Sequence, residues 1–420
     1  MTESDGIAAH LASARPRALA ALARYFRDLD LAEDAYQEAC LRAMRRWPGQ
    51  GLPRDPTAWL VLVARNAGID QQRRARSGLA DPLDEARLHE PGDPEALYAA
   101  AIDQAHLRDD VLRLLFMCCH PELPVQDQLA LALKVVAGLS VAEIARAFVI
   151  RPKAMEQRIT RAKKKAIAVA ARLDTLAPRE RAERLNAVST MVYLLFNEGY
   201  SAGAGELHIR VALCEEAIRL ARLLLAMFPG QAEVMGLLAL CLLHHARRKA
   251  RLDRDGALVP LDEQDRHLWE GELIAEGRVL IEKALRKGPA GPYQIQAAIA
   301  AVHCSAASPT ETDWAEIERL YELLEALQPS PIVTLNRAVA VSKTEGEEAA
   351  VALLLPLAES LADYRHYHTT LAAIQAELGQ FEDAKTAYRH ALALAPTQAE
   401  ATYIETRLAA VEEKISAAVG

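Results

Sequence analysis

The sequence predicts an all-α protein in which a helix-turn-helix domain precedes a long α-solenoid-like domain of helical repeats. Two observations support this fold class. Apolar residues recur at helical spacing along most of the chain, and hardly any stretch shows the alternation of a β-strand. Residues 138–165 carry the start signals of two short helices joined by a tight turn.

Composition and charge restrict the class of protein. Of the 420 residues, 51% are hydrophobic and 25% are charged, which is typical of globular proteins and allows two or three domains. No apolar run reaches the roughly 18 residues of a membrane span, and residues 1–17 lack a signal-peptide core, so we expect a cytoplasmic protein without membrane contact. The net charge of −8 argues against a general nucleic-acid coat, so any DNA binding must depend on a local basic region.

Cysteines and histidines predict neither a metal site nor a cofactor. The six cysteines have no paired spacing, which argues against a disulfide framework and a zinc ribbon. Cys118-Cys119-His120 has adjacent candidate ligands and no second pair nearby, so we interpret it as half-buried helix. We recognise no phosphate loop, nucleophile elbow or acid–base pair, and the sequence predicts no enzyme.

Residues 17–47 are predicted to form two helices separated by a turn at 28–30. The second helix, 31–44, is acidic early and basic late, as the helix dipole favours. A polar loop is expected from Trp47 to Arg54. Asp55 as N-cap and Pro56 in the first turn then begin a third helix, which ends in a basic segment. We interpret Trp59 of this helix as a core residue.

The helix-turn-helix prediction depends on local signals around residue 140. Ser140 and Glu143 have the spacing of a capping box, and Leu139 and Ile144 can staple the entering chain to the first turn. The first helix is expected to end near Phe148. The second is expected to begin at Pro152, because proline suits a first helical position.

The second helix sorts its residues by face. At about 100° per residue, Met155, Ile159, Ala162 and Ala166 form a stripe that can pack against the first helix. The opposite stripe carries Lys153, Gln157, Thr160 and Lys164, and the flanks carry Arg158, Arg161 and Lys163. Donors to base edges beside cations for phosphates are what a helix in the DNA major groove requires.

The remaining chain divides into a linker and a long helical part. Residues 77 to about 100 are acidic, contain prolines and lack periodicity, which is typical of a linker. Beyond about residue 181, similar helix ends recur at Pro229, Pro329 and Pro396, close to multiples of the roughly 34-residue tetratricopeptide period. The last unit has the small and aromatic packing residues of such a repeat: Leu371, Ala372, Gly379, Phe381, Ala384, Tyr388, Ala391 and Pro396.

Residues 28–47, 57–76 and 138–166 together resemble regions 2 and 4 of the extracytoplasmic-function (ECF) sigma factors of bacterial RNA polymerase. The resemblance implies four parts: region 2 in 1–76, an acidic linker in 77–104, region 4 in 105–172 and a tetratricopeptide-like regulatory domain in 173–420. The stretches 196–201, 259–265 and 335–340 look like ones that recur in the ECF group with such an extension. The first of these is expected to break a helix.

The resemblance also implies residue roles. The surface that binds the polymerase core would contain Asp34, Gln37, Glu38, Leu41 and Arg42. Opening of the −10 promoter element would use the loop 47–56 and the helix after it, with Arg54, Asn66, Arg73, Arg74 and Arg76. Reading of the −35 element would use Lys153, Gln157, Arg158, Thr160, Arg161 and Lys164.

The expected function is therefore promoter-specific initiation of transcription, with bacterial RNA polymerase core and promoter DNA as partners. The resemblance implies that the extension regulates the sigma domains in place of a separate anti-sigma protein, through contacts with those domains or with a protein partner. Two alternatives stay open. One is a one-component transcription factor that binds an operator unaided. The other is a repeat scaffold whose sigma part has decayed.

Overall fold

The protein is described by a computed structural model that covers residues 3–77, 111, 114–120, 122–148, 150–170, 178–200, 207–253, 259–395 and 398–419. Within these residues the regular elements are helices and no β-strand occurs, which confirms the all-α prediction. Two compact units divide the chain, Met1–Leu194 and Leu195–Gly420. The predicted linker 77–104 lies outside the described residues, apart from Ser77.

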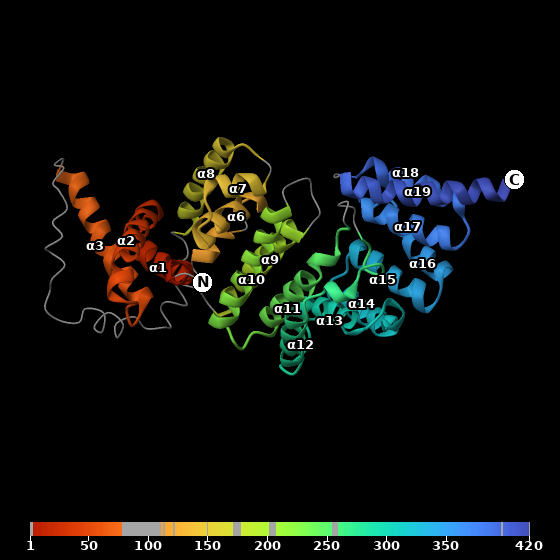
Figure 1. Ribbon diagram of the computed structural model, residues 1–420, viewed down its shortest axis with the longest axis horizontal. Coiled ribbons are helices and arrows are strands. Elements are labelled where there is room, and N and C mark those ends of the chain that lie inside the picture. The colour runs from red at the N-terminus through yellow and green to blue at the C-terminus, as the bar shows by residue number, and fades with distance from the viewer. Residues whose placement is uncertain are drawn as a thin grey trace. The chain divides into compact units, whose positions relative to one another are not determined.

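The first unit begins with a bundle of three helices that contact one another (Figure 1). They are α1 (Glu3–Phe26), α2 (Leu29–Gln50) and α3 (Pro56–Ser77). Apolar residues at helical spacing, among them Leu19 and Leu22 of α1 and Leu60 of α3, are completely or almost completely buried. A Cβ at Gly68 of α3 would lie 2.3 Å from the ring of Phe26, so the close approach of α1 and α3 requires glycine there.

The ends of these helices differ in part from the prediction. Asp28 caps α2 through hydrogen bonds to the amides of residues 30 and 31, and Asp55 accepts one from the amide of residue 58, as expected for N-caps. The polar loop expected from Trp47 to Arg54 is shorter, because α2 continues through Trp47 to Gln50. Burial of Trp47 against Trp59, with ring centroids 5.4 Å apart, holds this last turn in place.

A second group of helices in the first unit contains the predicted helix-turn-helix. It consists of α6 (Val125–Ala132), the π-helical turn η2 (Leu133–Ala137), α7 (Val141–Ala147) and α8 (Pro152–Ala170). The capping box is formed: the amide of Ser140 donates to Glu143 at 2.7 Å, and the amide of Glu143 donates to Ser140 Oγ at 3.2 Å. Both helices begin where the sequence predicted.

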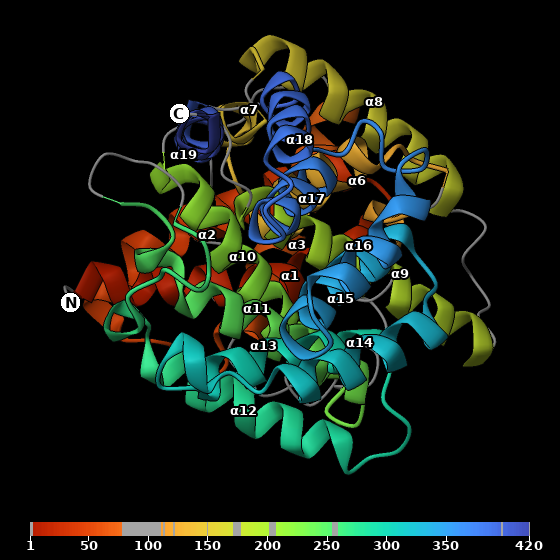
Figure 2. The same cartoon turned by 90° about the vertical axis from the view of Figure 1, so that its right-hand side faces the viewer.

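The second unit contains successive helices that pack against their neighbours in chain order (Figures 1 and 2). After α9 (Pro178–Tyr200), which crosses the unit boundary, they are α10 (Leu207–Met227), α11 (Ala232–Ala246), α12 (Gly271–Leu285), α13 (Pro292–Ser305), α14 (Trp314–Leu327), α15 (Pro331–Thr344), α16 (Glu347–Leu354), α17 (Arg365–Glu377), α18 (Phe381–Ala393) and α19 (Gln398–Val419). The almost entirely apolar α11 is buried nearly all round.

The stretch 196–201 does not break a helix, contrary to the prediction. It forms the last turn of α9 as far as Tyr200, and Ser201 lies outside the described residues. Phe196 and Tyr200 are one turn apart and stack with ring centroids 5.5 Å apart, so both rings face the same neighbour, His244 of α11. This aromatic contact holds the turn in helical form despite its glycine.

Arginine side chains cap the C-terminal ends of two helices in the second unit. Arg251 lies 3.6 Å above the ring of Tyr200 and donates to the Tyr200 carbonyl at the end of α9. Arg266 donates to the carbonyls of His303 and Ala306 at the end of α13. A cation at a helix C-terminus is favoured because it satisfies free carbonyls and complements the helix dipole. Arg251 and Arg266 therefore have a structural role.

Candidate functional site

The two faces of α8 have opposite character. Met155, Ile159, Ala162 and Ala166 are buried, with at most 4% of each side chain exposed. The residues of the opposite stripe, Lys153, Gln157, Thr160 and Lys164, are all exposed. This arrangement confirms the predicted division of the helix and leaves a continuous polar and cationic stripe accessible to a ligand.

Two flanking residues of α8, and Thr160 of the exposed stripe, also have partners within the first unit. Arg158 lies 3.6 Å from the carboxylate of Asp127 in α6. The Thr160 hydroxyl donates to the carbonyl of Glu156, and Arg161 Nε donates to that of Gln157 at 3.4 Å. DNA contacts by these three side chains would have to compete with these bonds, whereas Lys153, Gln157 and Lys164 project from the middle of the exposed stripe.

The outer face of α2 presents the residues predicted to bind the polymerase core. Asp34, Gln37 and Leu41 are exposed, and the Arg42 and Glu38 side chains form an ion pair at 3.0 Å. Leu41 and Met44 are 51% and 57% exposed, although apolar residues of α2 elsewhere are mostly buried. Large apolar side chains on an otherwise charged face are typical of a protein-binding surface. Sequence reasoning missed Met44, which helical spacing from Leu41 could have indicated.

The residues predicted to act on the −10 element lie on the turn before α3 and along that helix. Arg54, Asn66, Arg73 and Arg74 are exposed, whereas the side chain of Arg76 lies outside the described residues. Trp59 is only 8% exposed, so the structure supports its interpretation as a core residue. The predicted nucleic-acid residues thus form two separate surfaces, one on the bundle of α1 to α3 and one on α8.

A cluster of four charged side chains joins these two groups of helices, and all but one of them are largely buried. Lys163 Nζ of α8 lies 2.7 Å from Asp30 Oδ1 and 2.5 Å from Glu33 Oε2, both in α2. Arg15 of α1 lies 3.3 Å from Glu33 and donates to the backbone carbonyls of residues 134 and 135 in η2. We call Arg15, Asp30, Glu33 and Lys163 the inter-helix charge cluster. Sequence reasoning missed Arg15 and Glu33 entirely, because no local pattern marks a charge that becomes buried.

Burial and pairing act in opposite directions on Lys163. Burial lowers the pKa of a lysine, because the charged form loses solvation. Here the hydrogen bonds and charges of Asp30 and Glu33 outweigh burial, and the pKa of Lys163 lies above its usual range. Lys163 is therefore charged at neutral pH. Its side chain is only 12% exposed, which limits its availability to a phosphate.

Cys118 and Cys119, the tempting metal ligands of the sequence, lie in the core. Cys118 and Cys119 are fully buried rather than half-buried, and burial raises the pKa of both thiols. Among the residues that the structure describes, no group of three or more His, Cys, Asp or Glu side chains could hold a metal ion. No helix in this same part of the chain is long and apolar enough to cross a membrane.

Comparison with known protein families matches three segments of the chain. Residues 11–78 match the family Sigma-70 region 2, and residues 113–165 match Sigma-70, region 4. Residues 184–285 match a family of unknown function, DUF6596. An uncharacterized protein of Rhizobium meliloti (strain 1021) is 54% identical over 408 residues, which cover 97% of this chain and 96% of that protein. Together with the geometry of α2 and α8, these matches show that the chain belongs to the sigma-70 family, as an ECF-type sigma factor with a helical C-terminal extension.

Proposed function

We propose that α2, α3 and α8 divide the work of transcription initiation among three surfaces. In this proposal, the outer face of α2 binds the RNA polymerase core through Asp34, Gln37, Glu38, Leu41 and Arg42. The turn and helix α3 act on the −10 element through Arg54, Asn66, Arg73, Arg74 and Arg76. Helix α8 reads the −35 element through Lys153, Gln157, Arg158, Thr160, Arg161 and Lys164.

The observation that carries the proposal is the two-faced α8. A buried stripe fixes the rotation of the helix, so the exposed stripe must face outward as a unit. Gln157 can form paired hydrogen bonds with an adenine edge, and lysines beside it can neutralise phosphates. The same chain carries a region 2 with an exposed apolar and charged face on α2, which a lone DNA-binding domain would not need.

Affinity for free DNA is expected to be modest. Phosphate contacts dominate affinity for DNA, and the chain as a whole carries a net charge of −8. Binding energy from the polymerase core would then supply what the DNA contacts lack. The sigma factor contributes binding and strand opening, while the polymerase performs phosphoryl transfer.

The proposal assigns the second unit a modulating role. Its successive helices form an extended surface, and helical repeats of this kind commonly bind protein segments. The tetratricopeptide-like character that the sequence predicts for the unit from Leu371 to Pro396 is part of this proposal. Whether the unit raises or lowers transcription is an outcome of the experiment below.

Run-off transcription tests the proposal. Purified bacterial core polymerase, the gene's own upstream region and the full-length protein should give a transcript with a discrete start. A version cut near Leu176 then gives the sign of the modulation: higher activity makes the extension an inhibitor, and lost activity makes it a required part. Specific duplex binding without polymerase, and no transcript from either form, would favour the one-component transcription factor.

Charge reversal separates polymerase binding from folding. Asp34→Lys combined with Glu38→Lys should abolish association with the core, because both substitutions reverse charge on the α2 face. Glu405→Lys combined with Glu413→Lys makes the same charge change on exposed positions of α19 and serves as the control. Unchanged association of the α2 variant with polymerase would refute the assignment of this surface.

A further inference from the structure

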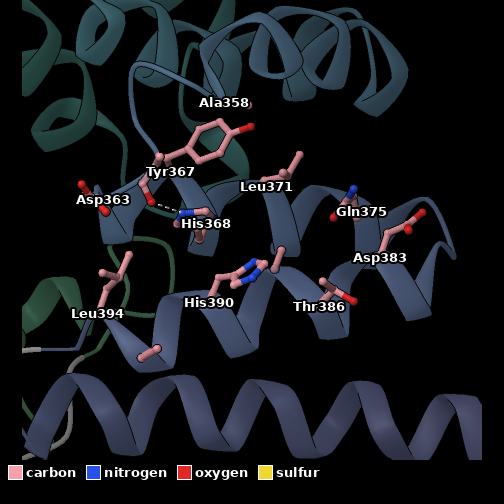
Figure 3. Close-up of a pocket in the computed structure, with 13 residues that line it drawn as sticks. Ala358, Asp363, Tyr367, His368, Leu371, Gln375, Asp383, Thr386, His390 and Leu394 are labelled. Carbon is pink, nitrogen blue, oxygen red and sulfur yellow. Dashed lines mark hydrogen bonds between the residues drawn. The ribbon is translucent and has the colours of Figure 1, made fainter.

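A groove of about 590 Å³ in the second unit lies between α17, α18 and the turn before α17 (Figure 3). Leu371, Ala387 and Leu394 give it an apolar floor. His368 and His390 lie across the middle, with ring centroids 5.5 Å apart. Such a combination of an apolar floor with a few polar groups is typical of a binding site.

Two carboxylates mark the ends of the groove. Asp383 and Asp363 both line the groove and lie at opposite ends of it (Figure 3). Both side chains are exposed. Neither forms an ion pair with any residue that the structure describes, and no lysine or arginine lines the groove.

The arginines of α17 and α18 are already paired elsewhere. Arg365 lies 2.7 Å from Glu400, and Arg389 lies 3.0 Å from Glu412, both in α19. The negative charge of the groove is therefore not balanced locally. This negative charge disfavours nucleic acids and acidic peptides as ligands and favours a cationic one.

The two imidazoles add further acceptors and flat surfaces. His368 Nε2 lies 2.7 Å from the carbonyl oxygen of Ala362. A carbonyl only accepts, so Nε2 carries the hydrogen, and Nδ1 of a neutral ring is left as an acceptor. The exposed ring of His390 gives an apolar or aromatic side chain a surface to pack on.

We propose that this groove binds a short segment of a partner protein in which apolar or aromatic residues are flanked on both sides by a lysine or arginine. Positions 383 to 394 of α18 span about 16 Å at the rise of an α-helix. An extended peptide covers this length in about five residues, which sets the spacing of the two cations. The proposal goes beyond the role in transcription initiation and does not depend on it.

Peptide binding to the full-length protein tests this inference. The probe is a fluorescein-labelled peptide of sequence Lys-Leu-Ala-Phe-Leu-Lys, compared with the same peptide carrying glutamate at both ends. Fluorescence polarisation should show saturable binding of the lysine peptide, with a Kd below about 100 μM that weakens with added salt. Equal binding of the two peptides, or no saturable binding of the lysine peptide, would overturn the proposal.

Variants locate the binding in the groove. Asp363→Asn combined with Asp383→Asn should weaken binding by about three- to tenfold, the range expected for two exposed ion pairs. Glu382→Gln, next to Asp383 but outside the groove, is the matched control and should leave binding unchanged. Ala393→Trp fills the groove from an exposed position and should block binding. If that variant binds normally while circular dichroism shows a normal fold, the peptide does not occupy the groove.

Discussion

The ammonium of Lys163 in α8 lies 2.5 Å from the carboxylate of Glu33 in α2, although 130 residues separate them in the chain. Both side chains are about nine-tenths buried, and Asp30 and Arg15 complete the inter-helix charge cluster around them. Loss of Glu33 would leave the buried ammonium of Lys163 with only the exposed Asp30, and loss of Lys163 would leave the buried Glu33 with only Arg15. Through this contact, the helix proposed to read the −35 element is bound to the helix proposed to bind polymerase.

If the proposed surfaces are correct, this contact and simultaneous binding of both promoter elements exclude each other. Helices α2 and α3 have 22 residues each and α8 has 19, so they are about 33 Å and 28 Å long. The two elements are named for positions about 25 base pairs apart, which is about 85 Å of straight duplex at about 3.4 Å per base pair. The charge cluster must therefore open before both elements can be bound, if the proposed surfaces are correct.

Chemical cross-linking provides the first prediction. A carbodiimide joins an amine to a contacting carboxylate, so it should link Lys163 to Glu33 or Asp30 in the free protein, and tryptic mass spectrometry identifies the product. Lys163→Met should remove this product, whereas Lys164→Met, an equal loss of charge at an exposed neighbour, should retain it. Added core polymerase should reduce the cross-link several-fold. An undiminished cross-link in an active polymerase complex would rule out opening of the cluster.

The helix-turn-helix could be predicted from the sequence in detail because its signals are local. The capping box, the start at Pro152 and the buried stripe of α8 all depend on residues within one or two turns of each other. Such signals favour a helix locally and need no contact with distant parts of the chain. The same holds for Asp55 at the start of α3.

Features that depend on tertiary packing could not be predicted in this way. Helix α2 passes through Pro48 because Trp47 packs against Trp59, and α9 reaches Tyr200 because its rings meet His244 of α11. The charge cluster joins Lys163 to residues 130 and 133 positions away, and a buried charge has no local sequence signature. The groove likewise depends on Asp363 and Asp383, which only the packing of α17 and α18 brings to one site.

The second prediction concerns promoter recognition. Gln157→Ala should reduce discrimination at one position of the −35 element by about 1–3 kcal/mol, because a paired base contact is lost. Lys164→Ala should instead weaken binding to all promoters and lower the salt dependence by about one phosphate contact. Base discrimination and salt dependence are both measured by titrating promoter variants with the polymerase complex at several salt concentrations. If Gln157→Ala weakens all promoters equally, the side chain does not read a base.

The third prediction concerns the bundle core of the first unit. Trp59→Ala should destabilise the bundle by about 3–5 kcal/mol, because it removes a large buried ring and leaves Trp47 without its partner. Faster amide hydrogen exchange in α2 and α3 would report this loss. Leu52→Ala, at a side chain that is 48% exposed, is the control and should change stability by less than about 0.5 kcal/mol. Normal exchange in the Trp59 variant would mean that the ring contact is not needed for packing.

The fourth prediction concerns pH and the second unit. Burial, together with Arg247 and Arg266, lowers the pKa of His303 to about 4, and burial followed by Arg247 lowers that of His244 well below its usual value. An unfolded histidine titrates near 6.5, so between about pH 6.5 and 4 the unfolded chain binds protons that the folded chain does not. Stability should therefore fall as the pH drops through this window, by up to about 1.4 kcal/mol per pH unit for each such histidine.

Thermal unfolding of the full chain between pH 4.5 and 7.5 measures this slope. His303→Gln should flatten the decline, because one group that gains a proton on unfolding is removed. His267→Gln replaces an exposed histidine and should leave the decline as it is in the unmodified protein. An equal slope in the His303 variant and the unmodified protein would show that His303 does not contribute. Arginines adjoin both His244 and His303, so protonation of either histidine would place a further positive charge beside a buried cation. We therefore expect acid to loosen the packing of α11 and α13 before that of the other helices of the unit.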